Sequence, residues 1–242
     1  MGVEFVVLVP GSVEIEDLVV DYQEFKRSRR KPMGSMEPFT AISRLTASIR
    51  PGEIVALLGR NGAGKSTLLK CISGFIRPSS GEVKTSGRVF LLAGSDPGLI
   101  PALSGMENAR ELGIAYGIKR EEVDDFVTSV KEFADLGGGF DRRVKGYSTG
   151  MRGKLGFGII TALKPDILLI DETLGVGDRE FRARAQIRLR EFIGRSGTVL
   201  ISTHSLGLAK ELCSRGVLLE DGKIEFEGGI QEAIDRYISI TD

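Results

Sequence analysis

The stretch GRNGAGKST at residues 59–67 decides the fold of this chain of 242 residues. An apolar run, IVALL, precedes it at 54–58, and a helical run, LLKC, follows it at 68–71. Glycines at this spacing let consecutive backbone N–H groups point at a phosphate, and the following helix adds the positive end of its dipole. Because strand, spacing and helix agree, the stretch predicts a phosphate-binding loop rather than a glycine-rich turn with an accidental Lys-Ser pair.

The loop also predicts individual contacts with a nucleoside triphosphate. We expect Lys65 to reach the β- and γ-phosphate oxygens and the Ser66 hydroxyl to bind Mg²⁺. The residues expected to hold the nucleotide are Gly59, Asn61, Gly62, Ala63, Gly64, Lys65, Ser66 and Thr67.

Short aliphatic runs recur along the chain, at 54–58, 89–92, 167–170 and 198–201. They are continuous rather than alternating, which is typical of parallel strands covered on both faces. The middle third, about 96–160, lacks such runs and has helical patterns. We therefore predict an α/β fold of the P-loop NTPase (RecA-like) type, with a sheet core, an inserted α-helical subdomain and small antiparallel β elements.

Within this fold we treat the chain as a single ATP-binding domain, with the sheet core at about 1–94 and 161–242 and the helical subdomain at about 95–160. Apolar residues three and four apart over 121–136 predict an amphipathic helix that ends at three glycines.

Two further stretches predict local structure near the ends of the chain. Asp221-Gly222 between two apolar runs predicts a β-hairpin, which a short C-terminal helix follows. The basic, turn-rich stretch at 26–36 shows no periodicity and predicts an exposed loop.

Three more polar side chains follow predicted strands. Asp171 and Glu172 end the run at 167–170, and His204 follows the run at 198–201. The carboxyl ends of parallel strands meet at one edge of a sheet, so we expect all three side chains beside the phosphate loop. There Asp171 would hold Mg²⁺ through water, Glu172 would activate an attacking water, and His204 would hydrogen-bond the γ-phosphate. Taken alone, these residues equally fit a solvated acidic turn and a structural histidine; their order after the loop favours catalysis.

The composition excludes several classes of protein. Hydrophobic residues make up 41% and charged residues 27%, with 33 Lys+Arg against 33 Asp+Glu. This balance is typical of a globular protein, and it gives no electrostatic reason to expect a nucleic-acid partner. The sequence has neither an apolar stretch of about 20 residues nor a secretory signal, so we expect it to remain in the cytosol. There Cys71 and Cys213 would be reduced core residues.

The chain resembles the ATP-binding subunits of ABC transporters over nearly its whole length. That family opens a helix of its helical subdomain with a signature, Leu-Ser-Gly-Gly-Gln. The corresponding stretch here is YSTGM at 147–151, which keeps Ser148 and Gly150. This form of the signature, together with DETLGVGD at 171–178, is similar to the branch that exports O-antigen, capsular polysaccharide and teichoic acids.

The resemblance implies an ATPase, with ATP and Mg²⁺ as cofactors, that works as a homodimer under two integral-membrane permease subunits. Each ATP would lie between the phosphate loop of one copy and Ser148 and Gly150 of the other, with Asp178 at the dimer seam and His204 as the switch histidine. Ser148 would cap a helix that runs to about Leu163. The cargo would be a lipid-linked glycan or polyol-phosphate polymer, and the subunit would sit peripherally on the cytoplasmic face of the cell membrane.

The sequence departs from the family pattern at two places. Ser95 stands where the family usually has a glutamine that binds magnesium and water, so we expect a water-mediated metal contact and an altered link to transport. Tyr22 best fits the aromatic that stacks on adenine, with Phe25 and Phe39 as rivals. The basic run at 26–31 could face anionic lipid headgroups or a phosphorylated polymer, or form a solvated surface.

Two other functions remain open from the sequence. An exporter of drugs or lipids would carry the same ATPase residues. A non-transport ABC ATPase of DNA repair or translation would share the chemistry, but such proteins generally carry long coiled coils or two tandem cassettes, for which 242 residues leave no room.

Overall fold

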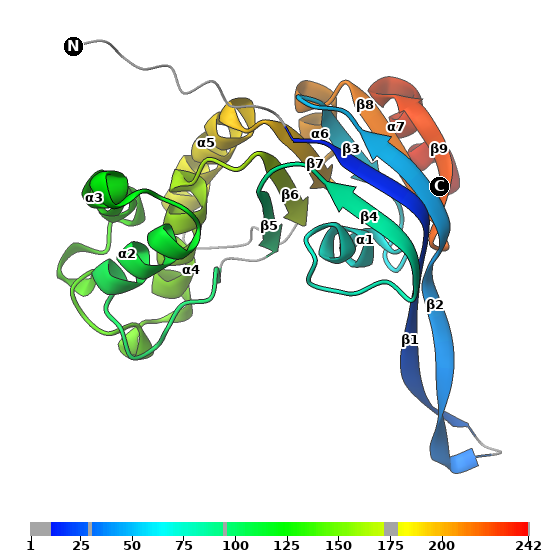
Figure 1. The fold of residues 1–242 in the computed structure, drawn as a ribbon, viewed down its shortest axis with the longest axis horizontal. Helices are drawn as coiled ribbons and strands as arrows, with labels where there is room; N and C mark the ends of the chain where they lie inside the picture. The colour runs from blue at the N-terminus through cyan, green and yellow to red at the C-terminus, as the bar shows by residue number, and fades with distance from the viewer. Residues whose placement is uncertain (1–10, 29–30, 94–95, 172–178, 242) are drawn as a thin grey trace. The chain divides into compact units, whose positions relative to one another are not determined.

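The computed structural model describes residues 11–28, 31–93, 96–171 and 179–241 (Figure 1). The chain forms two compact units. The first, here called the sheet unit, comprises 1–91, 166–172 and 197–242, and the second, the helical unit, comprises 92–165 and 173–196.

The main sheet has six strands in the order β5-β6-β7-β3-β8-β9. Their bounds are β3 (Ile54–Leu58), β5 (Val89–Ala93), β6 (Ile167–Asp171), β7 (Thr198–Ser202), β8 (Arg215–Glu220) and β9 (Lys223–Gly229). Strands β6, β7, β3 and β8 pair in parallel, and β9 pairs antiparallel with β8. All four predicted apolar runs are strands of this sheet, and the predicted hairpin turns at Asp221 and Gly222, both with positive φ.

A second, antiparallel sheet has the order β2-β1-β4, with bounds β1 (Val13–Ser28), β2 (Lys31–Ile49) and β4 (Ser80–Thr85). Because β4 pairs with β1 only as far as Val19, the two longer strands continue beyond it as a two-stranded ribbon (Figure 1). The predicted loop over 26–36 is therefore wrong: strand pairing there includes Phe25 with Met36. Met36 is 58% exposed, so this part of the ribbon lacks the buried face that produces an alternating pattern.

One apolar core joins the two sheets through α1 (Lys65–Ile72). It takes in residues of β1 and β2, such as Ile15 and Ile42, residues of the main sheet, such as Leu57, and Leu69 of α1. The other helices of the sheet unit are α6 (Leu206–Leu212) and α7 (Ile230–Thr241), the predicted C-terminal helix. The two cysteines, Cys71 and Cys213, are buried and unpaired, as predicted.

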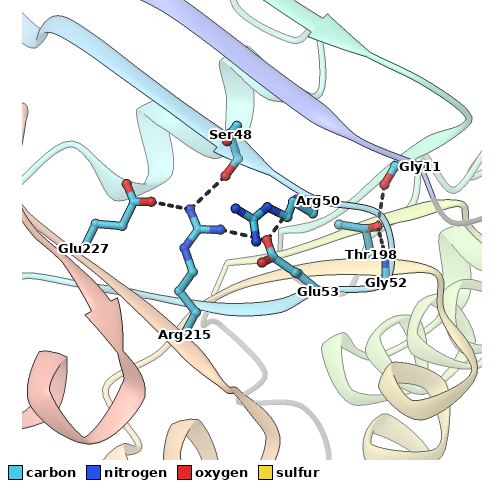
Figure 2. A network of polar contacts seen from close by, with 8 residues as sticks. All are labelled: Gly11, Ser48, Arg50, Gly52, Glu53, Thr198, Arg215 and Glu227. Carbon is cyan, nitrogen blue, oxygen red and sulfur yellow. Dashed lines mark hydrogen bonds and ion pairs between the residues drawn. The ribbon is translucent and has the colours of Figure 1, made fainter.

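A polar network ties together the amino ends of β3, β7 and β8 (Figure 2). Arg215, at the start of β8, forms ion pairs with Glu53 at 2.7 Å and with Glu227 of β9 at 2.6 Å. Thr198, at the start of β7, is fully buried and accepts a hydrogen bond from the Gly52 N–H at 2.9 Å. These contacts fix the edge of the sheet opposite to the carboxyl ends of its parallel strands.

The helical unit is built from four helices: α2 (Gly105–Ala115), α3 (Val123–Ala134), α4 (Thr149–Ala162) and α5 (Arg179–Arg195). Three 3₁₀ turns connect them: η1 (Arg120–Glu122), η2 (Gly137–Gly139) and η3 (Val144–Gly146). The amphipathic helix predicted at 121–136 is α3, although Asp135, with φ of 49°, and not a glycine takes the left-handed position at its end.

Helix α5 belongs to the helical unit, although the predicted division placed residues 161–242 in the sheet core. The reason is aromatic packing. Phe181 of α5 lies with its ring 5.5 Å from that of Phe133 on α3 and 6.2 Å from that of Phe157 on α4. Such pairs contribute about 0.5–1.5 kcal/mol beyond the area they bury.

Candidate nucleotide-binding site

The loop between β3 and α1 encloses a lysine. Lys65 is only 8% exposed, and its Nζ donates to the carbonyl oxygens of Gly59 at 2.6 Å and Arg60 at 2.9 Å. The ammonium group is therefore held inside the loop, at the amino end of α1. A phosphate oxygen that enters the loop would meet this charge directly.

Close packing against β2 and the β8–β9 turn shapes the same loop. Gly64 caps α1 with φ of 103°, and a Cβ there would lie 2.7 Å from the carbonyl oxygen of Ala41. On the other side, the Gly222 N–H donates to the carbonyl oxygen of Ala63 at 3.1 Å. Because Gly64 has no side chain to cap the helix, the first N–H groups of α1 are left to an anionic ligand.

Strand register brings further predicted residues to the loop's edge of the sheet. Asp171, the last residue of β6, pairs with Ser202 of β7, which in turn pairs with Leu57 of β3. His204 is exposed and follows the end of β7 by two residues. Asp171 and His204 thus lie at the carboxyl edge of the strands, where the exposed Ser66 begins α1.

Two exposed aromatic residues lie opposite each other on the ribbon. Tyr22 pairs with Phe39, and the two side chains are 38% and 46% exposed. Directly opposed residues of an antiparallel pair project from the same face of the sheet. Ala41, whose carbonyl oxygen packs beside Gly64, is only two residues from Phe39. The aromatic pair is therefore close to the phosphate loop, whereas Phe25 lies about 10 Å further along the strand.

The predicted signature lies at the start of α4, in the helical unit. Ser148 is the N-cap of this helix, and its Oγ accepts a hydrogen bond from the Met151 N–H at 3.2 Å. The helix ends at Ala162, so both the cap and the predicted length are confirmed. Ser148 and Gly150 line a cavity of about 590 Å³.

Tyr147, which departs from the family's leucine, has a structural role. Its side chain is 8% exposed, and its hydroxyl donates to the carbonyl oxygen of Gly139 at 2.7 Å. Burial raises the pKa of this phenol, so it remains a neutral hydrogen-bond donor. The bond anchors the residue directly before Ser148.

Some functional candidates escape the sequence patterns, and others escape the structure. Arg142 and Lys154 line the same cavity as Ser148; the spacing of four between Gly150 and Lys154 on α4 was a usable signal. Three predicted residues lie outside the described part of the chain: Ser95, Glu172 and Asp178.

A phosphate loop after one strand, an aspartate that ends a second and a histidine after a third define a P-loop nucleotide-binding protein. The comparison with protein families is specific: residues 42–175 match the ABC transporter model. The chain belongs to this family, which confirms the predicted resemblance and, with it, the prediction of an ABC-type ATPase that binds ATP.

Curated relatives cover most of the chain. The teichoic acids export ATP-binding protein TagH of Staphylococcus haemolyticus is 33% identical over 93% of this chain and 88% of its own length. The O-antigen export system ATP-binding protein RfbB of Klebsiella pneumoniae is 38% identical over 82% of this chain and 81% of its own length. TagH of Listeria monocytogenes is 40% identical over 84% of this chain, which spans only 60% of that relative.

Solved structures confirm the predicted fold class. The ATP-binding subunit of an ABC transporter superposes with a TM-score of 0.74 at 23% identity, over 95% of this chain and 99% of that one. A dimeric ATP-binding cassette gives a TM-score of 0.69 at 22% identity, over 90% of this chain and 98% of the other.

Proposed function

We propose that this chain is the ATP-hydrolysing subunit of an exporter that moves a lipid-linked polysaccharide, O-antigen or teichoic acid across the cell membrane. The observation that carries the ATPase part is the buried Lys65 inside the phosphate loop, at the edge of the sheet that also bears Asp171 and His204. The printed functions of TagH and RfbB support the cargo class.

In this proposal each side chain at the sheet edge has a separate task. Lys65 and the N–H groups of α1 bind the β- and γ-phosphates, and His204 donates to the γ-phosphate. Glu172 polarises the attacking water, and Tyr22 stacks on adenine.

Mg²⁺ completes the cofactors of the proposed reaction. Among the described residues there is no group of three or more His, Cys, Asp or Glu that would form a protein cage for a metal. Magnesium at phosphates needs no such cage, because it takes one or two protein oxygens together with phosphate and water. The hydroxyl of Ser66 and the carboxylate of Asp171 fit this pattern, with Ser95 as a further ligand through water. Bound there, the ion would neutralise charge on the phosphates.

The proposed assembly is a homodimer beneath two permease subunits. Ser148, Gly150 and Asp178 would serve the ATP held by the other copy, and residues 94–108 would contact the permease. No helix within the described ranges is long and apolar enough to cross a bilayer. We therefore place the chain at the cytoplasmic face of the membrane through its partners, with no role for nucleic acid.

Two experiments test the proposal. Glu172→Gln should bind ATP and hydrolyse it at least about a hundredfold more slowly, trapping an ATP-bound dimer in size-exclusion chromatography. Rapid turnover by this variant would remove Glu172 from its role. For the cargo, the chain should be purified from gently solubilised membranes of its host. Recovery of a permease with a lipid-linked polymer supports the exporter, whereas a drug or lipid permease, or DNA-repair or ribosomal proteins, would support one of the two alternative functions.

A further inference from the structure

His204 contacts a residue of the C-terminal helix that has no part in the proposed reaction. The hydroxyl of Tyr237 on α7 lies 3.5 Å from Nδ1 of His204. Tyr237 is partly buried, whereas His204 is exposed. We propose that Tyr237 is a positioning residue: its hydroxyl donates to Nδ1, so that the ring carries its proton on Nε2 and presents an N–H donor. The inference rests on the proposed function for the phosphate that this donor meets, but the tautomer itself does not depend on it.

The chemistry of imidazole links its two nitrogens. A neutral ring has one N–H and one lone pair, and the partner of one nitrogen fixes the state of the other. If His204 donated from Nδ1 to Tyr237, its Nε2 would present a lone pair, which an acceptor-only phosphate oxygen cannot bind. A donating Tyr237 gives the tautomer that binds an anion. The separation of 3.5 Å is long, as catalytic hydrogen bonds often are before the substrate binds.

The packing of α7 explains why Tyr237 reaches this position. Ile230, Ala233, Ile234 and Tyr237 recur at intervals of three and four, so they share one face of the helix. This face lies on β8 at Gly216, where an added Cβ would be 2.5 Å from that of Ala233. The absence of a side chain at Gly216 thus lets α7 approach the sheet closely, and Tyr237 extends the packed face by one further turn.

The backbone around His204 is fixed from its own side. Thr203, which is 4% exposed, accepts a hydrogen bond from the Ser205 N–H at 3.0 Å. Ser205 caps α6 by accepting from the Leu208 N–H. Because α6 also packs on α7, these elements bring the imidazole to the tyrosine, and the hydroxyl is then left to select the tautomer.

The chain offers a direct measurement, because His204 is its only histidine. The full chain, labelled with ¹⁵N-histidine and freed of any histidine tag, gives one pair of ring-nitrogen signals in long-range ¹H–¹⁵N NMR spectra. At about pH 8.5, two units above the usual histidine pKa, the ring is neutral. We expect a protonated Nε2 and an unprotonated Nδ1 in the wild-type chain. Tyr237→Phe should shift both signals toward a mixture of tautomers and lower ATP turnover about two- to tenfold.

Ser239→Ala is the matched control, because it removes a hydroxyl from the same helix that bonds only to the carbonyl oxygen of Arg236. It should keep the wild-type histidine signals and turnover. A protonated Nδ1 in the wild-type chain would overturn the proposal without any variant, and so would unchanged signals in Tyr237→Phe. Shifted signals in Tyr237→Phe, alongside a wild-type chain that does not hydrolyse ATP, would support the positioning role and contradict the proposed function instead.

Discussion

At the scale of single residues, Tyr22 and Phe39 offer a purine base two rings rather than one. The two exposed side chains oppose each other beside the phosphate loop. Stacking of a base on an aromatic side chain is worth about 1–3 kcal/mol. Tyr22→Ala should therefore weaken ATP binding by roughly 5- to 150-fold, with a smaller loss for Phe39→Ala, as measured by calorimetry.

Inorganic triphosphate is the control ligand for this prediction, because it has no base to stack. Its affinity should be unchanged in both variants. An equal loss for triphosphate and ATP would show that the substitutions disturb the loop through β2 and do not remove a base contact.

The buried cysteines predict how stability depends on pH. Burial raises the pKa of Cys213 from 9.0 to about 12, so the folded chain keeps this thiol protonated at a pH where the unfolded chain ionises it. The stability that this preference contributes is complete below pH 9 and is lost as pH rises toward 12. Between pH 8 and 10 the free energy of unfolding should fall by about 1 kcal/mol more in wild type than in Cys213→Ala, measured by urea denaturation. Parallel curves for the two chains would contradict this assignment.

At the scale of elements, Ser148 combines two roles that substitutions can separate. As the N-cap of α4, its replacement by alanine should cost about 1 kcal/mol of stability. Aspartate also caps helices well, so Ser148→Asp should keep near wild-type stability in thermal unfolding. Its negative charge would nevertheless repel the γ-phosphate that the proposed dimer brings to this helix, and ATP hydrolysis should fall at least about tenfold. Wild-type hydrolysis by Ser148→Asp would reduce the residue to a structural cap.

Elements were predictable where burial leaves a local pattern. Strands β3, β6 and β7 are covered on both faces, so their sequences are continuous apolar runs. The ribbon of β1 and β2 carries exposed side chains such as Met36 and Phe39 along its outer part, and backbone pairing alone leaves no alternation to read. The place of α5 depends on Phe181 meeting rings from two other helices, which no local spacing encodes.

The same distinction holds for the candidate site. The phosphate loop, Asp171 and His204 follow strands directly, so the order of motifs along the chain placed them at one edge. Tyr237 reaches His204 across 33 residues through helix packing at Gly216, and Phe39 reaches Tyr22 through strand register. Contacts of this kind depend on tertiary structure and leave no motif.

At the scale of the whole molecule, the proposed dimer assigns the two halves of each ATP site to different chains. In a two-fold dimer, one site combines the phosphate loop of the first chain with the Ser148 helix of the second, and the other site combines the reverse. Lys65 and Ser148 lie in separate units of one chain, which leaves each available to a different ATP.

This arrangement predicts complementation between two inactive chains. Lys65→Ala should lose phosphate binding, and Ser148→Asp should lose the helix contribution, so each homodimer has two defective sites. A mixed dimer carries both defects in one site and none in the other, because the Ser148→Asp chain supplies an intact loop and the Lys65→Ala chain an intact Ser148. With equal mixing, half of the dimers are mixed and half of their sites are whole, so ATPase activity should recover to about a quarter of wild type if the two sites act independently. Lys70→Ala, at the far end of α1, provides the control for the lysine substitution and should remain active without a partner. Activity in the mixture no greater than the mean of the two variants alone would mean that each chain completes its own site, and the proposed head-to-tail dimer would have to be abandoned.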